Sequence, residues 1–183
     1  MKTNLGTSLL KIYLVLLLPL PAMARKIVVS PGTMIPTLKR GVEMANNGDT
    51  ILVRKGTYIS FNTIINKELT VLGENEPVLD AKFQEEVVTI TSGHVKFDGF
   101  IIKNSKTGSM RDYAGIRLSS VEDVTISNNK LINNFFGIYL SDCKHIQVLH
   151  NTLIGSNNVE NSGNGIHLWK CREILIKGNH VTR

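Results

Sequence analysis

The sequence predicts an all-β fold, a right-handed single-stranded parallel β-helix with an N-terminal capping helix. Three observations support this prediction. Short bursts in which apolar and polar residues alternate recur along the chain, as expected for strands with one buried face. Asn and Gly separate the bursts, which is typical of tight turns. Later segments repeat one pattern at a fixed spacing, which indicates stacked coils.

The first 24 residues, 1–24, are predicted to be a cleavable secretory signal peptide. Lys2 and Lys11 flank the start of a nearly continuous aliphatic run over 12–20, and Ala22–Ala24 forms an A-x-A cleavage site. The run is shorter than the ~20 residues that a transmembrane helix needs, so we do not expect a membrane-spanning chain. Cleavage after Ala24 lowers the formal net charge from +6 to +4. That small charge, without any basic run, argues against a nucleic-acid partner.

Residues 25–48 are expected to cap the N-terminal end of the solenoid. A short amphipathic helix is predicted over 33–47, because apolar residues follow helical spacing there. Thr33 or Thr37 is the expected N-cap. Asn and Gly at 46–48 are the expected C-terminal stop.

Residues 49–183 are predicted to form the coils, and the repeat is explicit after residue 114. Each repeat holds a strand that follows a Gly, a middle strand and a strand that follows an Asn. The three copies cover 115–118, 124–126 and 129–132; 137–140, 146–148 and 151–154; and 165–168, 174–176 and 179–182. The copies are spaced by 22 and then by 28 residues, and the six extra residues fall in a polar loop around 157–162.

The alternation in each burst separates inward from outward positions. The expected inward residues are Ile116, Leu118, Val124, Ile126 and Leu131. Asn129, Asn151 and Asn179 share one column at a turn, and we interpret them as an internal asparagine ladder. A leucine-rich repeat also has Leu and Asn columns, but its L-x-x-L-x-L frame does not fit these bursts.

Two neighbouring outward columns on the first strand of the repeat form a candidate binding surface. They hold Arg117, Tyr139 and His167, and Ser119, Ser141 and Trp169. An exposed Trp beside a His often marks a binding surface. The alternative is that these are ordinary solvent-facing positions.

Cys143 and Cys171 are one repeat apart and share the column of Val121. Free buried thiols, a disulfide and metal ligation are all compatible with this spacing. Cys143-Lys144-His145 is also a C-x-H triplet, and further imidazoles and a thioether occur in the same segment. We therefore take His145, Cys143 and His167 as candidate metal ligands, with copper as the metal that such donors suit.

No catalytic residue is predicted. Glycosidases need two carboxylates on one face, and the outward face of the repeat has none. Tyr139 or His167 could act as a general base in a lyase, but no second cation that would neutralise a substrate carboxylate is evident.

Several segments of the chain resemble the NosD family. They are 112–116, 136–140 and 162–168 with Trp169, together with the cap helix, 48–51, 55–58 and 78–80 near the start. The stretch from Gly163 to Trp169 is the most specific of them. The resemblance covers nearly all of residues 25–183.

The resemblance implies a non-catalytic periplasmic accessory protein. Members of the family are described as copper-binding, work with an ATP-driven transporter and serve assembly of the copper–sulfur centre of nitrous oxide reductase. Family members continue for further coils, so we expect this chain to be shortened at its C-terminal end. A carbohydrate-active β-helix, either a polysaccharide lyase or hydrolase or a sugar-binding module, is the alternative, because fold alone does not exclude it.

Overall fold

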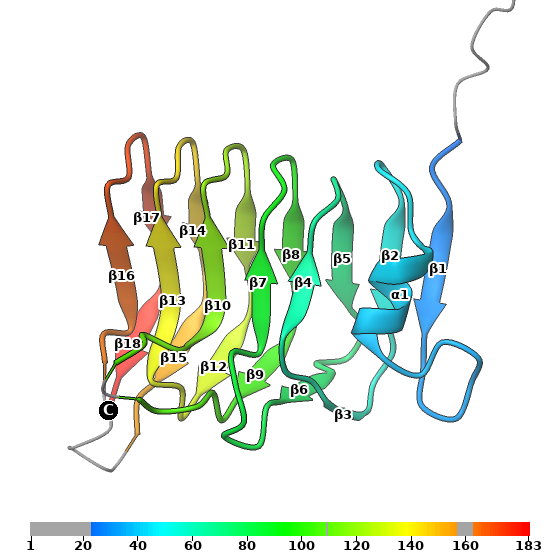
Figure 1. Cartoon of the computed structure of the whole chain (residues 1–183), viewed down its shortest axis with the longest axis horizontal. Helices are drawn as coiled ribbons and strands as arrows, with labels where there is room; N and C mark the ends of the chain where they lie inside the picture. Colours follow the sequence, from blue (N-terminus) through cyan, green and yellow to red (C-terminus); the bar gives the residue numbers. More distant parts are fainter. Residues whose placement is uncertain (1–22, 109, 157–162) are drawn as a thin grey trace, which may run out of the picture.

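The computed structural model describes residues 23–108, 110–156 and 163–183, and it confirms a parallel β-helix. The coils stack side by side along the long axis of the molecule, as Figure 1 shows. Most of the expected signal peptide and the polar loop at 157–162 lie outside the described residues.

Each complete coil contributes one strand to each of three parallel sheets. Sheet 1 contains β1 (Lys26–Val29), β2 (Thr50–Val53), β5 (Thr70–Gly73), β8 (Lys96–Asp98), β11 (Thr125–Ser127), β14 (Gln147–Leu149) and β17 (Leu175–Lys177). Sheet 2 contains β4 (Thr63–Ile65), β7 (Val88–Ile90), β10 (Ala114–Ser119), β13 (Phe136–Ser141) and β16 (Ile166–Trp169). Sheet 3 contains β3 (Thr57–Ile59), β6 (Val78–Asp80), β9 (Ile101–Lys103), β12 (Lys130–Ile132), β15 (Thr152–Ile154) and β18 (His180–Thr182).

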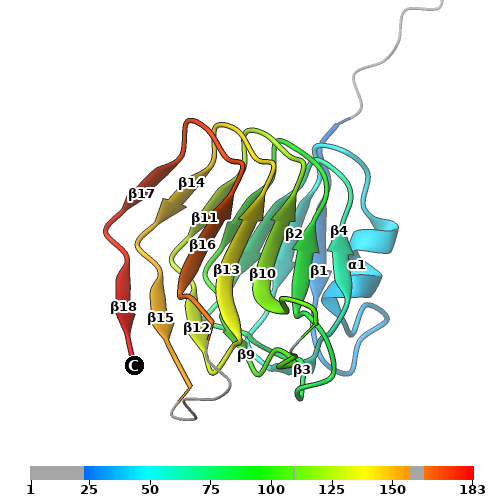
Figure 2. The ribbon, with the colours of Figure 1, turned by 60° about the vertical axis from the view of Figure 1, so that its left-hand side comes forward.

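The three sheets enclose an interior, which Figure 2 shows from a view closer to the solenoid axis, and the core side chains fill it. The register places like residues above one another: Val71, Phe97, Ile126 and Val148 are successive partners in sheet 1, and all four are fully buried. All of the expected inward residues are buried as well. Each fully buried aliphatic side chain contributes roughly 1.5–3 kcal/mol of hydrophobic free energy. A single coil could not bury these side chains alone, so the stabilisation depends on the stack.

The capping helix α1 (Leu38–Met44) is shorter than the helix expected over 33–47. Pro36 accounts for the later start, since proline disfavours helical backbone in the residue before it. Thr37 is the N-cap, and its hydroxyl accepts a hydrogen bond from the Arg40 backbone N–H. The last helical residue is Met44, and the C-cap Ala45 has extended backbone. The C-cap therefore comes one residue before the stop expected at 46–48.

Helix α1 contacts β1, β2 and β4 at the N-terminal end of the stack (Figure 1). Its buried face includes Leu38 and Val42. Gly41 lies so close to β1 that an added Cβ would come within 2.8 Å of Val29 Cγ2. Strand β1, which the sequence pattern did not predict, adds a further strand to sheet 1 by pairing with β2.

The three asparagines of the repeat hydrogen bond from coil to coil. Asn151 Oδ1 accepts from the Asn129 backbone N–H at 2.9 Å, and Asn179 Oδ1 accepts from that of Asn151 at 2.9 Å. Their side-chain amides donate to backbone carbonyls of the adjoining coils. Asn134 is a further buried asparagine, outside the column that the repeat predicts. It accepts from the Ser105 backbone N–H and donates to a backbone carbonyl in β9.

Candidate functional site

Sheet 2 carries the candidate binding surface on its outward side. Arg117 of β10, Tyr139 of β13 and His167 of β16 are register partners, so their side chains form one row across the strands. On β10 and β13 the residues on either side of Arg117 and Tyr139 are buried in the core, which leaves the side chains of the row on the solvent side of the sheet. Trp169 lies two residues beyond His167 on the same face and is 55% exposed.

The row is a continuous stack of a cation and two rings. The Arg117 guanidinium lies 4.2 Å from the centre of the Tyr139 ring, and the Tyr139 and His167 rings are 4.7 Å apart at 28°. Phe136 packs edge-on against both rings. Cation–π and stacked pairs of this kind each contribute about 0.5–2 kcal/mol. We call Arg117, Tyr139, His167 and Trp169 the binding face.

The buried carboxylate of Glu86 compensates the positive charge of Arg117. Glu86 is 1% exposed, accepts from Arg117 Nε and accepts from Thr89 Oγ1 at 2.9 Å. The Arg117 guanidinium also donates to the Asp112 backbone carbonyl. Arg117 is therefore held in place, and its side chain is only 17% exposed. The sequence pattern did not point to Glu86, because this residue lies in a connection before β7 that is not part of the clear repeat.

A contact with the Asn164 side chain holds the His167 ring. Its Nδ1 lies 3.0 Å from the Asn164 side-chain amide nitrogen. An amide nitrogen only donates, so Nδ1 is the acceptor in this contact. The binding face thus presents fixed ring surfaces rather than free charges, and this geometry suits stacking against a partner more than acid–base chemistry.

The candidate metal ligands Cys143, His145 and His167 occupy three different environments. His167 belongs to the binding face, and Cys143 is 1% exposed. Burial, with a smaller effect from the nearby Cys171, raises the pKa of the Cys143 thiol to about 11, and a protonated thiol is a poor metal ligand. Only His145 among them belongs to a potential metal-binding group in the described residues, and it does so with Glu122 and Asp123.

Both cysteines are free thiols in the structure. Parallel bridges join Glu122 to Lys144 and Lys144 to Arg172, which places Cys143 and Cys171 in neighbouring coils of one column. Each Sγ donates to the backbone carbonyl two residues earlier in its own coil. Cys171 is half-buried, so it is the more accessible thiol of the pair.

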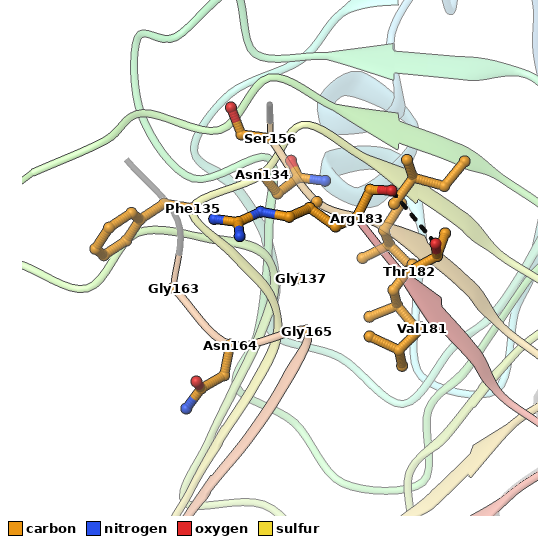
Figure 3. Close-up of a pocket in the computed structure, with 14 residues that line it drawn as sticks. Asn134, Phe135, Gly137, Ser156, Gly163, Asn164, Gly165, Val181, Thr182 and Arg183 are labelled. Carbon is orange, nitrogen blue, oxygen red and sulfur yellow. Dashed lines mark hydrogen bonds between the residues drawn. The ribbon is translucent and has the colours of Figure 1, made fainter. Parts of the chain in front are cut away.

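A separate pocket lies near the last described coil, between sheet 3, Gly137 of β13 and the glycines that precede β16 (Figure 3). Its apolar wall includes Leu153, which is buried, and Val181, which is exposed. Figure 3 shows the Arg183 side chain reaching across it toward Phe135. Among the described lining residues, Arg183 is the one charged group, and Asn134, Asn164 and Thr182 contribute polar side chains.

Within the described residues, no helix is long and apolar enough to cross a membrane.

A sequence model of the NosD family, described as "Periplasmic copper-binding protein (NosD)", matches residues 41–183. Two curated relatives carry the name "Probable ABC transporter binding protein NosD". The one from Pseudomonas aeruginosa is 28% identical over 124 residues, which cover 66% of this chain and 29% of the relative. The one from Stutzerimonas stutzeri is 33% identical over 72 residues, which cover 38% of this chain and 16% of the relative. This chain therefore matches less than a third of either relative.

Among solved structures, a rhamnogalacturonan lyase has the same fold. Its TM-score is 0.62 at 14% sequence identity, over 85% of this chain and 56% of the lyase chain. At that identity the likeness concerns the fold alone. The family assignment rests on the sequence match, which includes every coil that carries the binding face. This chain belongs to the NosD family.

Proposed function

We propose that this protein is a non-catalytic periplasmic accessory protein for maturation of nitrous oxide reductase. It would assist assembly of the reductase's copper–sulfur centre together with an ABC transporter. The observation that carries the proposal is the family match over residues 41–183, supported by relatives named as transporter binding proteins. The family's description as periplasmic agrees with the expected signal peptide at 1–24.

The binding face is the surface that we assign to docking. Its rings are fixed by stacking, by Glu86 and by Asn164, so little side-chain entropy is lost when a partner covers them. Trp169 is the most exposed member, and large rigid aromatic residues dominate binding energy in many interfaces. The transporter and the reductase are the proposed partners.

The test is deletion of the gene in its host, followed by complementation. Loss of nitrous oxide reduction and of the copper–sulfur spectrum, with reductase polypeptide still present, would support the maturation role. Complementation with Trp169→Ala should restore activity poorly, whereas Gln147→Ala, an exposed outward position on β14, should restore it fully. Normal maturation of the reductase in the deletion strain would refute the proposal.

Carbohydrate binding is the second candidate function, and the observation that favours it is the flat stacked row of Tyr139 and His167 beside Trp169. Sugar rings pack their apolar faces on such aromatic surfaces. A polysaccharide lyase or hydrolase would further need an acid or base, and Glu86, the buried acid under the row, is already paired with Arg117. Retention on immobilised acidic polysaccharide that Trp169→Ala abolishes, in a strain with normal reductase, would favour this candidate.

A further inference from the structure

Cys143 and Cys171 lie side by side in neighbouring coils, at the turn that leads from sheet 2 to sheet 1. The parallel bridge between Lys144 and Arg172 fixes the register of the residue that follows each cysteine. A backbone hydrogen bond of 3.0 Å from the Arg172 N–H to the Cys143 carbonyl joins the two coils at the same place. Paired strands are ~4.8 Å apart, and disulfides join residues whose Cα atoms are about 4.4–6.8 Å apart. The backbone therefore holds the two cysteines within reach of a disulfide.

The two thiols also have equivalent directions. The Cys143 Sγ donates to the Ser141 carbonyl at 3.2 Å. The Cys171 Sγ donates to the Trp169 carbonyl at 3.3 Å. Ser141 and Trp169 are register partners in sheet 2, so the two sulfur atoms occupy like positions one coil apart. Burial is the larger cause of the raised pKa of the Cys143 thiol, and the nearby Cys171 thiol adds to it.

The fold does not require sulfur in this column. Val121 occupies the same place one coil earlier and is 6% exposed, so an aliphatic side chain packs there. Cys143 belongs to the core cluster, and Cys171 packs against that cluster while remaining half-buried. The column thus brings together two thiols of unequal access, where valine would serve the packing.

A groove that reaches both cysteines is lined mainly by cations. Three of its six lining residues are cationic and one is anionic, so the groove attracts a negatively charged reagent. Its lining consists of Asp142, Cys143, Lys144, Lys170, Cys171 and Arg172. Because Cys143 is 1% exposed, a reagent in the groove reaches Cys171 first.

We propose that Cys143 and Cys171 form a reversible disulfide between neighbouring coils, and that the oxidant is a small anionic disulfide that binds in this groove. The Cys171 thiolate attacks one sulfur of the oxidant, which forms a mixed disulfide and releases one thiol. Cys143 then gives up its proton and attacks the Cys171 sulfur, so that the second thiol leaves. Two electrons pass from the cysteine pair to the oxidant, whose two halves leave as thiols with the two protons.

The disulfide fastens the coil that carries β16 to the coil that carries β13. Trp169 of the binding face lies two residues before Cys171, so the bond holds the end of β16 in register with β13. Disulfides form and persist in oxidising compartments. The inference therefore takes from the proposed function only the periplasmic location of the protein.

The experiment equilibrates the purified protein with mixtures of oxidised and reduced glutathione at pH 8 and then blocks free thiols with iodoacetamide. Peptide mass spectrometry should find Cys143 linked to Cys171, in a fraction that rises with the proportion of oxidised glutathione. Cys143→Val should instead accumulate glutathione on Cys171, because no second thiol displaces it. Oxidation should raise the urea midpoint of the wild type and leave that of Cys143→Val unchanged.

The charge of the groove is tested by the rate of oxidation. Lys170→Gln should slow oxidation by glutathione disulfide by about twofold or more, and should not slow oxidation by the uncharged 2-hydroxyethyl disulfide. Lys177→Gln is the matched control, because Lys177 is an exposed cation of β17 that does not line the groove. Equal rates for the wild type and Lys170→Gln with glutathione disulfide would overturn the assignment of the groove.

Absence of the linked peptides in fully oxidised glutathione would overturn the proposal, as would a disulfide that joins two chains. Equal urea midpoints for oxidised and reduced wild type would show that the bond does not fasten the coils. Far-UV circular dichroism establishes that each variant is folded, and the wild-type measurement needs no variant. The transporter and the reductase take no part, so a failure here is distinct from a failure of the proposed function.

Discussion

Asn151 links three coils through one side chain. Its Oδ1 accepts from the Asn129 backbone N–H and side-chain amide, and its Nδ2 donates to the Ile126 carbonyl and to Asn179 Oδ1. The residue is 1% exposed, so water cannot replace these partners. A buried polar group left without a partner costs about 1–3 kcal/mol.

We therefore expect Asn151→Leu to lower the free energy of unfolding by about 2 kcal/mol or more, because several buried groups lose their partner at once. Urea denaturation of the two proteins measures the difference. Asn128→Gly is the control: Asn128 is exposed, and glycine accepts its φ of 55°. Equal losses in both variants would show that the ladder does not stabilise the stack.

The two thiols differ in exposure, although they share a column. Cys143 is 1% exposed and its pKa is raised to about 11, chiefly by burial, whereas Cys171 is half-buried. Since the thiolate is the reactive form, iodoacetamide at pH 8 should label Cys171 at least tenfold faster than Cys143. Peptide mass spectrometry over a time course measures both rates. Equal labelling would mean that Cys143 is far more accessible than the fold implies.

At the scale of single elements, the strands of sheet 2 approach one another closely at a column of glycines. A Cβ added at Gly137 would lie 2.4 Å from the Gly165 carbonyl oxygen and 2.6 Å from Leu153 Cδ2. The backbone at Gly165 cannot move away from such a Cβ without breaking the pairing of β13 with β16. The alignment of Tyr139 with His167 depends on this pairing.

Gly137→Ala should consequently destabilise the protein by more than 2 kcal/mol, measured as the shift in the urea midpoint at constant m-value. Gly155→Ala is the matched control, because a Cβ there meets its nearest atom, the Thr182 carbonyl oxygen, at an ordinary 3.6 Å. A neutral Gly137→Ala variant would contradict the close packing described for this column.

The strands of the repeat were easier to predict from the sequence than the N-terminal cap. The strands after residue 114 match the expected segments closely, because every coil there repeats one spacing. The cap was less predictable. Helical spacing over 33–47 did not reveal that Pro36 delays the helix, nor that 26–29 pairs with β2 as strand β1. Neither segment has a repeated copy with which it could be aligned.

Asp49 links the segment around Arg25 to the first coil of the solenoid. It accepts from the backbone N–H groups of Asn46 and Arg25, both at 2.8 Å, and from the Arg25 guanidinium. These hydrogen bonds, that of Asn46 foremost, lower the pKa of Asp49 from 3.8 to about 2. Cleavage after Ala24 would convert the Arg25 nitrogen into a charged α-amino group beside this carboxylate.

A folded-state pKa below the ordinary value stabilises the protein above about pH 4, and this stabilisation is lost as the pH falls toward 2. Asp49→Asn should therefore lower the Tm at pH 6, and the difference from wild type should shrink between pH 4 and pH 2. Thermal unfolding by circular dichroism at several pH values tests this. A difference that is constant with pH would show that ionisation of Asp49 does not contribute.

The spacing of the repeat is enough to predict which residues become neighbours between coils. In a solenoid the repeat length is also the register, so the spacings of 22 and 28 residues placed Arg117 beside Tyr139, and Tyr139 beside His167. The surroundings of those columns depend on how the whole chain packs. Glu86 reaches Arg117 from a connection outside the clear repeat. Likewise Asp123 contacts His145, whereas Cys143 and His167 lie outside the group formed by Glu122, Asp123 and His145. Side-chain direction and the paths of irregular connections depend on packing, and the spacing of residues in the sequence does not reveal them.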